Sequence, residues 1–445
     1  MKFLFPRLNF WLLLLFILTL ILFVFGLKPN AQAFDLSVLP SRTISIEVQG
    51  PDVSPTPLVP VWNFLDKLQE AKNLVASSSF NLQVGKKDIV YYEKRITLNS
   101  AGNITVSNKR LTDPEREIAL VLIDLKSGDL ETIKITERGN SITSPKGYDI
   151  KNVERPNGIT NNAWNTCRQV VAPLNKAVVL NVWPHYVTIK VAKPIRNKKG
   201  TVIRTIYTSK EVVESVVYSP YCDDLHKPEF VENGKNYRQS ISRQALELLR
   251  EKSVHSRTFP DKLLADVIAE GKYLKLEYFE RLPLIEHMDY GEFKLDSQKS
   301  SERVDVILGT NTNQAYNLTC SGKKACGWLQ YTKSTWNDMR IKNPSAQLSI
   351  FETGVKDHVM SMVAAMLLHD NNLKAGVAKF GLKVFENNDW GEEMLAANYN
   401  GGPARPYSAY RASILDSLGD WLINPMRTET KQYIEKLRFV RENYN

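Results

Sequence analysis

The stretch Leu282-Pro283-Leu284-Ile285-Glu286-His287-Met288 places one carboxyl group within an apolar run. If a helix ends here, it presents Glu286 from an apolar wall. Desolvation in such a place raises the pKa of a carboxyl group and keeps it protonated near neutral pH, as an acid that protonates a leaving oxygen must be. The alternative is an amphipathic helix with Glu286 in solvent, which is the more common position of an acidic side chain.

Two further motifs follow this stretch in the sequence. The first is Cys326-Gly327-Trp328-Leu329-Gln330-Tyr331, and the second is Tyr399-Asn400-Gly401-Gly402-Pro403. Between them, residues 355–369 carry Val, Met and Leu at helical spacing, which predicts a buried helix whose methionines belong to the core. His358 and His369 lie in this segment, and we expect them to be surface or capping groups rather than metal ligands.

In this order, the three motifs resemble the lytic transglycosylase domain of the lysozyme-like superfamily, over roughly residues 260–420. The resemblance implies that Glu286 is the catalytic residue, acting first as an acid and then as a base. The residues that it implies for substrate binding are Gly327, Trp328, Gln330, Tyr399 and Asn400. For Trp328 the alternative is a side chain that packs inward.

Each implied residue has a role in the family. Gly327 lets the backbone approach the sugar, because glycine has no Cβ, and Gln330 reaches the glycan. The resemblance implies that the hydroxyl group of Tyr399 lies beside the catalytic carboxyl group and that Asn400 binds substrate near the scissile bond. Gly401 stands where the family has Ala.

The chain departs from the family near Glu286. His287 stands where the family usually has Ser. The gap from Glu286 to Gly327 is also longer than the family norm, which implies an inserted loop across about residues 294–319. Because of this insertion, Glu292 is a rival for the catalytic role, since it lies closer to the expected spacing.

The function that the resemblance implies is cleavage of peptidoglycan. A retaining or inverting hydrolase needs a second carboxylate at a fixed distance from the first, and no motif supplies one. We therefore expect a lytic transglycosylase, in which Glu286 protonates the oxygen that links N-acetylmuramic acid to N-acetylglucosamine. The same group then takes the proton of the muramyl 6-hydroxyl, which closes a 1,6-anhydro ring.

This chemistry requires no metal and no cofactor. Two alternatives stay open. The first is a muramidase of lysozyme type, in which water replaces the 6-hydroxyl. The second is a binding or scaffold protein of the cell envelope that holds the glycan without cutting it.

The N-terminus predicts export. Lys2 and Arg7 precede the apolar run Phe10–Leu27, after which Ala31-Gln32-Ala33 supplies a cleavage pattern. We expect residues 1–33 to be a cleaved signal peptide. The run is close to the minimum length for spanning a bilayer, so an uncleaved anchor is the alternative.

The net charge of +10 suits peptidoglycan, nucleic acid or an anionic membrane. We expect glycan strands as the partner and no nucleic acid, with membrane contact only through an uncleaved N-terminal segment. An exported chain also permits disulfides among Cys167, Cys222, Cys320 and Cys326. Cys320 and Cys326 are close in sequence and are expected to pair, which leaves Cys167 and Cys222.

We expect an α+β protein with two domains. Residues 34–60 are rich in Pro and read as a linker. Residues 61–234 predict a short helix and then a β-rich domain, either a sandwich or an open antiparallel sheet, to which cell-envelope proteins are possible partners. The expected strands are 89–98, 118–125, 130–136, 178–191 and 202–207.

The aromatic side chains Trp183 and Tyr186 of this β-domain belong either to a glycan-binding face or, more simply, to the core. Residues 235–445 predict an α-helical lysozyme-like domain, with helices at 240–251 and 260–270 and with Pro260 in the first turn of the second. We expect the chain beyond the third motif to end in a packing helix.

Overall fold

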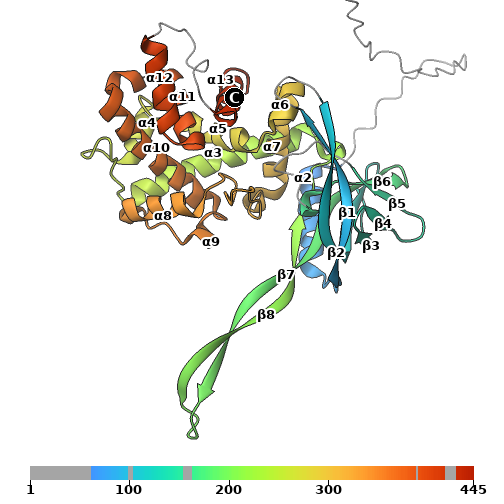
Figure 1. Cartoon of the computed structure of the whole chain (residues 1–445). Helices are drawn as coiled ribbons and strands as arrows, with labels where there is room; N and C mark the ends of the chain where they lie inside the picture. The colour runs from blue at the N-terminus through green and yellow to red at the C-terminus, as the bar shows by residue number, and fades with distance from the viewer. Residues whose placement is uncertain (1–61, 99–103, 154–162, 387–388, 416–426, 445) are drawn as a thin grey trace, which may run out of the picture. The chain divides into compact units, whose positions relative to one another are not determined.

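The structure, a computed structural model, describes residues 62–98, 104–153, 163–386, 389–415 and 427–444. All of the described residues belong to one compact unit, Val59–Asn445. The signal or anchor segment and the Pro-rich linker expected from the sequence lie outside the described residues. Within the described residues the protein is a mixed α/β structure with an antiparallel sheet, as expected (Figure 1).

The main sheet has the strand order β4-β3-β2-β7-β8, with β1 paired to the other half of β2, and every pair is antiparallel. A second, two-stranded sheet contains β5 and β6. The strands are β1 (Val84–Leu98), β2 (Ile104–Asp124), β3 (Leu130–Arg138), β4 (Ser141–Thr143), β5 (Asp149–Asn152), β6 (Arg168–Ala172), β7 (Lys176–Arg196) and β8 (Val202–Tyr218).

The strand β2 is buried on both faces along its second half. Every residue from Ile118 to Ile123 is buried. The even-numbered residues share a core with Ile150 and Val170 of the small sheet, whereas the odd-numbered ones join the main core, which includes Leu68 of the first described helix. Because successive residues of a strand point to opposite faces, burial on both sides explains an apolar run without alternation.

The two aromatic residues considered for a glycan-binding face do not form one. Trp183 is 9% exposed, and the guanidinium group of Arg116 lies 3.9 Å from the centre of its ring. Tyr186 is 40% exposed, and its hydroxyl group donates a hydrogen bond to the Val84 carbonyl. The core role is therefore confirmed for Trp183.

Helices make up most of the chain after β8. They are α3 (Pro228–Glu251), α4 (Leu264–Glu270), α5 (Leu276–His287), α6 (Tyr290–Leu295), α7 (Ser297–Asn311), α8 (Lys333–Lys342), α9 (Phe351–Gly354), α10 (His358–Phe380), α11 (Asp389–Gly401), α12 (Ala404–Leu415) and α13 (Thr428–Asn443); α2 (Phe64–Ser77) precedes the sheet. Pro260 lies in a turn before α4, not in its first turn. The inserted loop expected across 294–319 is mostly helix α7.

The domain boundary predicted at residues 234 and 235 falls inside α3. The prediction placed the boundary at Gly234, but a Cβ at this position would lie 1.9 Å from the Asp305 carbonyl oxygen of α7. A Cβ at Gly309 would likewise meet the Phe230 carbonyl oxygen at 2.1 Å. The two glycines thus allow α3 and α7 to pack backbone against backbone, which is a tertiary requirement that looks like a turn signal in the sequence.

Two disulfides link the described part of the chain, Cys167–Cys222 and Cys320–Cys326. The pairing expected for Cys320 and Cys326 is confirmed. The bonds are typical of an oxidising, exported environment. Within the ranges that the structure describes, no helix combines the length and the apolar character needed to cross a membrane.

The outer halves of β7 and β8 have only each other as neighbours. From Thr188 to Lys210 every residue is exposed except the half-buried Ile206. Figure 1 shows this part of the hairpin as a twisted two-stranded ribbon that extends beyond the sheet. The strand β8 is far longer than the segment 202–207 expected from the sequence.

Candidate active site

A cleft of about 640 Å³ opens where four segments of the helical region meet. These are the end of α5, the loop before α8 together with the start of α8, the end of α11, and α13. Clefts of this volume are typical of ligand sites. The lining residues include Glu286, Asp289, Gln330, Tyr331, Asp338, Tyr399, Asn400, Glu429, Tyr433 and Lys436.

The carboxyl group of Glu286 faces this cleft but is closely surrounded by protein. Tyr433 Oη donates a hydrogen bond of 2.8 Å to Glu286 Oε1. Burial raises the pKa of Glu286 to about 7, although the bond from Tyr433 and the charge of Lys436 oppose the rise. A carboxyl group with such a pKa is partly protonated at neutral pH, which suits a general acid.

Lys436 is a buried cation next to Glu286. Its Nζ donates hydrogen bonds to the carbonyl oxygens of Ile285 and, at 3.0 Å, Met288. A cation in this position caps the C-terminal end of α5 and interacts favourably with the helix dipole. Burial lowers the pKa of Lys436, whereas the charge of Glu286 raises it. Lys436 therefore holds the helix end from which Glu286 projects.

Four tyrosines, of which three are buried and Tyr399 is partly buried, lie close enough to feel the charge of Glu286. Burial is the largest cause of the raised pKa of each phenol, and the negative charge of Glu286 contributes to all four. They are Tyr278, Tyr331, Tyr399 and Tyr433. Because their phenols stay protonated, the carboxyl group lies among hydroxyl groups and aromatic rings rather than bulk water.

Tyr399 lines the cleft together with Glu286, but its hydroxyl group bonds elsewhere. Its hydroxyl group donates to the Leu329 carbonyl oxygen at 2.6 Å. The hydrogen bond to Glu286 comes from Tyr433 instead. Tyr399 therefore ties the end of α11 to the second motif and forms part of the wall around Glu286.

The second motif follows the loop closed by the Cys320–Cys326 disulfide, and the backbones of Cys326 and Tyr331 bond to each other across it. Gly327 has a φ of 78°, and a Cβ there would lie 2.3 Å from the Val355 carbonyl oxygen. Gly327 is thus required by packing against Val355, and it does not line the cleft. Gln330 does line it; its backbone has a φ of 50°, and its Nε2 donates to the Gly327 carbonyl at 2.7 Å.

Trp328 does not line the cleft. Its side chain is fully buried, and its ring stacks on His358 with the ring centres 4.3 Å apart. No surface of this ring is left for a sugar, so its placement as a substrate-binding residue is wrong. The alternative, a side chain that packs inward, is correct.

Asn400 lines the cleft at the end of α11. Its Oδ1 accepts a hydrogen bond of 3.1 Å from Thr430 Oγ1 of α13. The neighbouring Gly401 explains one departure from the family pattern, because a Cβ at this position would lie 2.6 Å from the same Thr430 hydroxyl. The close approach of α13 therefore favours Gly over Ala here.

Glu292 and His287 both face away from the cleft. Glu292 forms an ion pair with the buried Arg303 and is not among the lining residues. His287 is fully buried, stacks on Tyr316 and bonds through Nε2 to the Trp328 carbonyl at 2.6 Å. The rival catalytic assignment is therefore not supported by position, and His287 is not among the residues that line the cleft.

His358 and His369 are not surface or capping groups. Both are buried; His358 bonds to the Ala315 carbonyl and the Tyr237 hydroxyl group, and His369 to the Ala365 carbonyl. Burial lowers the pKa of His358 to about 3 and that of His369 to about 4. They act as neutral core groups that satisfy buried hydrogen-bonding partners.

Sequence reasoning missed Tyr433 and Lys436, because the last helix was assigned only to packing. One signal was available. Tyr433, Leu437 and Val440 define the buried face of α13, and Lys436 lies on that face. A Lys at a core position is rare unless it is paired, so it pointed to a partner elsewhere in the fold.

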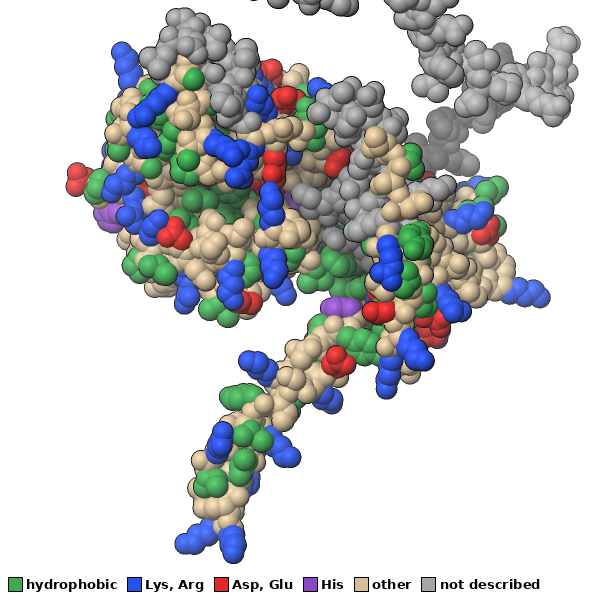
Figure 2. Space-filling view, viewed as in Figure 1, with side chains coloured by type: hydrophobic (Ala, Val, Ile, Leu, Met, Phe, Trp, Pro, Cys, Tyr) green, Lys and Arg blue, Asp and Glu red, His purple; other side chains and the backbone are tan. Residues whose placement is uncertain are grey.

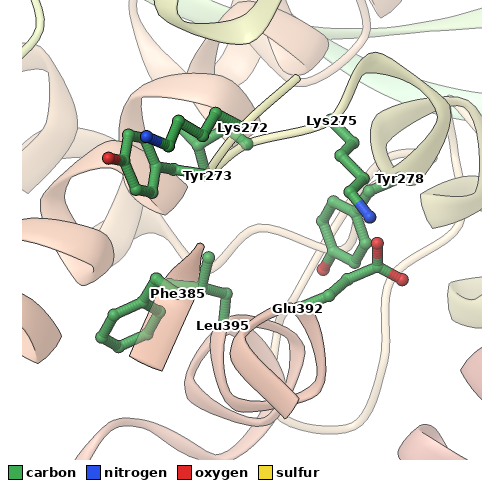
Figure 3. A pocket seen from close by; sticks show the side chains of 8 residues that line it. Lys272, Tyr273, Lys275, Tyr278, Phe385, Glu392 and Leu395 are labelled. Atoms are coloured by element: carbon green, nitrogen blue, oxygen red, sulfur yellow. The ribbon is translucent and has the colours of Figure 1, made fainter. Parts of the chain in front are cut away.

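A second pocket beside α5 is too small to bind a sugar. Its volume is about 20 Å³, which is room for a single water molecule. Figure 3 shows Tyr278 in it, with the ammonium group of Lys275 directed toward the carboxyl group of Glu392. Within the described ranges, no group of three or more His, Cys, Asp or Glu side chains is arranged to hold a metal ion.

The comparisons with known proteins do not add an assignment. No protein-family model matches the chain, and neither a curated protein nor a solved structure is similar to it.

Proposed function

We propose that the chain is a peptidoglycan lytic transglycosylase whose helices α3–α13 act as a lysozyme-like catalytic part. One observation carries the proposal. Glu286 is a desolvated carboxyl group with a pKa raised by burial to about 7, and it faces a cleft that is also lined by Gln330, Tyr399 and Asn400. The three motifs that suggested the family are far apart in sequence, yet they converge on this one cleft.

The chemistry requires one group with two states. In its protonated state, Glu286 gives its proton to the oxygen that links N-acetylmuramic acid to N-acetylglucosamine, and the glycosidic bond breaks. The resulting carboxylate takes the proton of the muramyl 6-hydroxyl, whose oxygen closes the 1,6-anhydro ring. The bond from Tyr433 stabilises the carboxylate between the two steps, since hydrogen bonds to the charged form favour it.

The other acidic residues of the cleft favour this mechanism over hydrolysis with a second carboxylate. Asp289 accepts the Gly291 and Glu292 amides as the N-cap of α6. Asp338 pairs with Lys342 at 2.8 Å, and Glu429 pairs with Lys323 at 3.1 Å. Asp289 thus serves as a helix cap, and Asp338 and Glu429 lie in largely exposed ion pairs. A hydrolase needs a second carboxylate at a set distance from the acid.

The test is a digest of purified peptidoglycan with the unit Val59–Asn445, followed by mass spectrometry of the released fragments. We expect 1,6-anhydro ends, which lack the water that hydrolysis adds. Fragments with reducing ends would replace the proposal with a muramidase. Binding to sacculi without release of fragments would indicate a scaffold protein.

The catalytic residue is tested in the same assay. Glu286→Gln removes the acid but keeps the side-chain shape, so release should fall about a thousandfold. The matched control is Glu292→Gln, which changes a carboxylate outside the cleft and should keep the activity. Activity that survives in Glu286→Gln and disappears in Glu292→Gln would move the assignment to Glu292.

A further inference from the structure

The outer end of the β7–β8 hairpin has an unusual composition that the cleft does not explain. From Thr188 to Lys210 the sequence contains seven Lys and Arg residues and no Asp or Glu. We define the hairpin tip as residues 193–206. Its cations are Lys193, Arg196, Lys198, Lys199 and Arg204.

Aliphatic side chains lie beside these cations. Residues that pair directly across an antiparallel ladder point to the same face. In the tip, Lys193 pairs with Ile206, Arg204 with Ile195, and Arg196 with Val202. Three cross-strand pairs in the tip thus each combine one cation with one aliphatic group.

These side chains are exposed to solvent. Ile203 is 64% exposed and Ile195 is 37% exposed. Among the residues that the structure describes, none of the tip cations has a carboxylate partner within ion-pair distance. Figure 2 shows the same mixture along the hairpin, with Lys and Arg interleaved with hydrophobic side chains and acidic groups only toward its base.

The turn that joins the strands is ordered by its own hydrogen bonds. Asn197 Oδ1 accepts from the amides of Lys199 and Thr201, and Arg196 donates to the Gly200 carbonyl at 2.8 Å. The cations and aliphatic groups of the tip therefore flank a turn that is fixed by hydrogen bonds.

We propose that the hairpin tip docks on the surface of an anionic lipid bilayer. The Lys and Arg side chains contact the phosphate groups, and Ile195, Val202 and Ile203 enter the boundary between headgroups and acyl chains. An acidic polymer would satisfy the cations but would leave the aliphatic groups in water, whereas a bilayer surface satisfies both. This contact is additional to the expected one through the N-terminal segment, and it does not depend on the proposed enzyme activity.

The test uses the unit Val59–Asn445, which has its own core and both disulfides and lacks the apolar N-terminal run. Its binding to mixed phosphatidylcholine and phosphatidylglycerol vesicles is compared with its binding to pure phosphatidylcholine vesicles by co-sedimentation. We expect binding to the anionic vesicles that weakens as salt is added. Equal binding to both kinds of vesicle, or to neither, would overturn the proposal.

Two variants separate the two components of the contact. Lys193→Gln/Lys198→Gln/Lys199→Gln should weaken binding to anionic vesicles about tenfold or more. Ile195→Ser/Ile203→Ser keeps the net charge and should also weaken binding several-fold. If the second variant binds as well as the parent, the tip is a general site for polyanions and the lipid assignment fails.

The matched control for charge is Lys356→Gln/Lys374→Gln/Lys383→Gln, which removes three exposed cations from the helical region. It should bind vesicles like the parent. Two further outcomes would also overturn the proposal. One is binding to purified sacculi that the tip variants abolish while vesicle binding persists, and the other is a dimer in solution that the Ile variant converts to a monomer.

Discussion

Charged side chains have opposite environments in the cleft and at the hairpin tip. In the cleft, Glu286 and Lys436 are surrounded by protein and bonded to defined partners. At the tip, Lys193 and Arg204 are exposed and lie beside aliphatic groups rather than carboxylates. The difference indicates two kinds of task. Fixed charges in a desolvated site suit the movement of one proton, and exposed charges on a ribbon suit a broad surface that adapts to them.

Mild acid should destabilise the helical region more than any single substitution proposed below. Burial lowers the pKa of His287 and His358 to about 3 and that of His369 to about 4. The ordinary value of histidine in an unfolded chain is about 6.5. Between these values the unfolded chain binds more protons than the folded one, so the stability present above about pH 6.5 is lost as the pH falls.

At pH 5.5 the expected loss is about 1.4 kcal/mol for each histidine, or about 4 kcal/mol together. The measurement is denaturant unfolding of the Glu286→Gln variant at pH 7 and pH 5.5, because the raised pKa of Glu286 would give the parent chain an opposite gain in stability over this interval. His255 is exposed, so His255→Gln should leave the difference between the two pH values unchanged. Equal free energies of unfolding at both pH values would contradict the burial of these three side chains.

Two glycine substitutions compare how tightly the helical region and the hairpin tip are packed. Gly234→Ala forces a methyl group against the Asp305 carbonyl between α3 and α7, and should lower the free energy of unfolding by about 3 kcal/mol. In Gly200→Ala at the hairpin turn, the added Cβ has no other atom within 4 Å. The only cost is the left-handed backbone conformation, with a φ of 82°, which should lower the free energy of unfolding by about 1 kcal/mol. Thermal unfolding of both variants tests this order, and similar losses would break the comparison.

Removal of the hydrogen bond to Glu286 should affect catalysis more than folding. Tyr433→Phe deletes the donor that stabilises the carboxylate, so kcat should fall about tenfold with little change in KM. The control is Tyr290→Phe, which loses a comparable bond to Glu435 at another part of the cleft. If the two variants have the same kcat, Tyr433 does not act on the reacting carboxyl group.

The smallest expected effect is a displaced pH profile. The charge of Lys436 lowers the pKa of Glu286, so Lys436→Met should raise it. Because the first step of the proposed mechanism needs the protonated acid, activity should then persist to higher pH. A pH–rate profile measures the displacement, with Lys294→Met as a control that removes a cation paired with Glu435. A profile that shifts to lower pH would contradict the assigned influence of Lys436.

Local patterns in the sequence predicted those parts of the fold that neighbouring residues determine. Apolar runs in the sequence predicted the strands β2, β3 and β7. The short spacing between Cys320 and Cys326 predicted their disulfide. The apolar residues just before Glu286 also predicted that its carboxyl group is desolvated, because these residues are its neighbours in the sequence.

Features set by distant contacts could not be predicted in this way. A domain boundary was predicted at Gly234 because the reason for a glycine there, the close approach of α7, comes from residues far along the chain. His358 and His369 looked like surface groups because their partners come from other elements. Tyr433 was missed for the same cause, since its carboxylate partner is separated from it by 147 residues.

That separation has a consequence for biosynthesis. A ribosome that has already translated Glu286 must add 147 more residues before Tyr433 exists. Until this helix emerges from the exit tunnel and docks, the nascent polypeptide lacks one wall of its cleft as well as the cap on α5. A chain released before α13 is complete therefore lacks both the Tyr433 hydrogen bond to Glu286 and the Lys436 cap on α5.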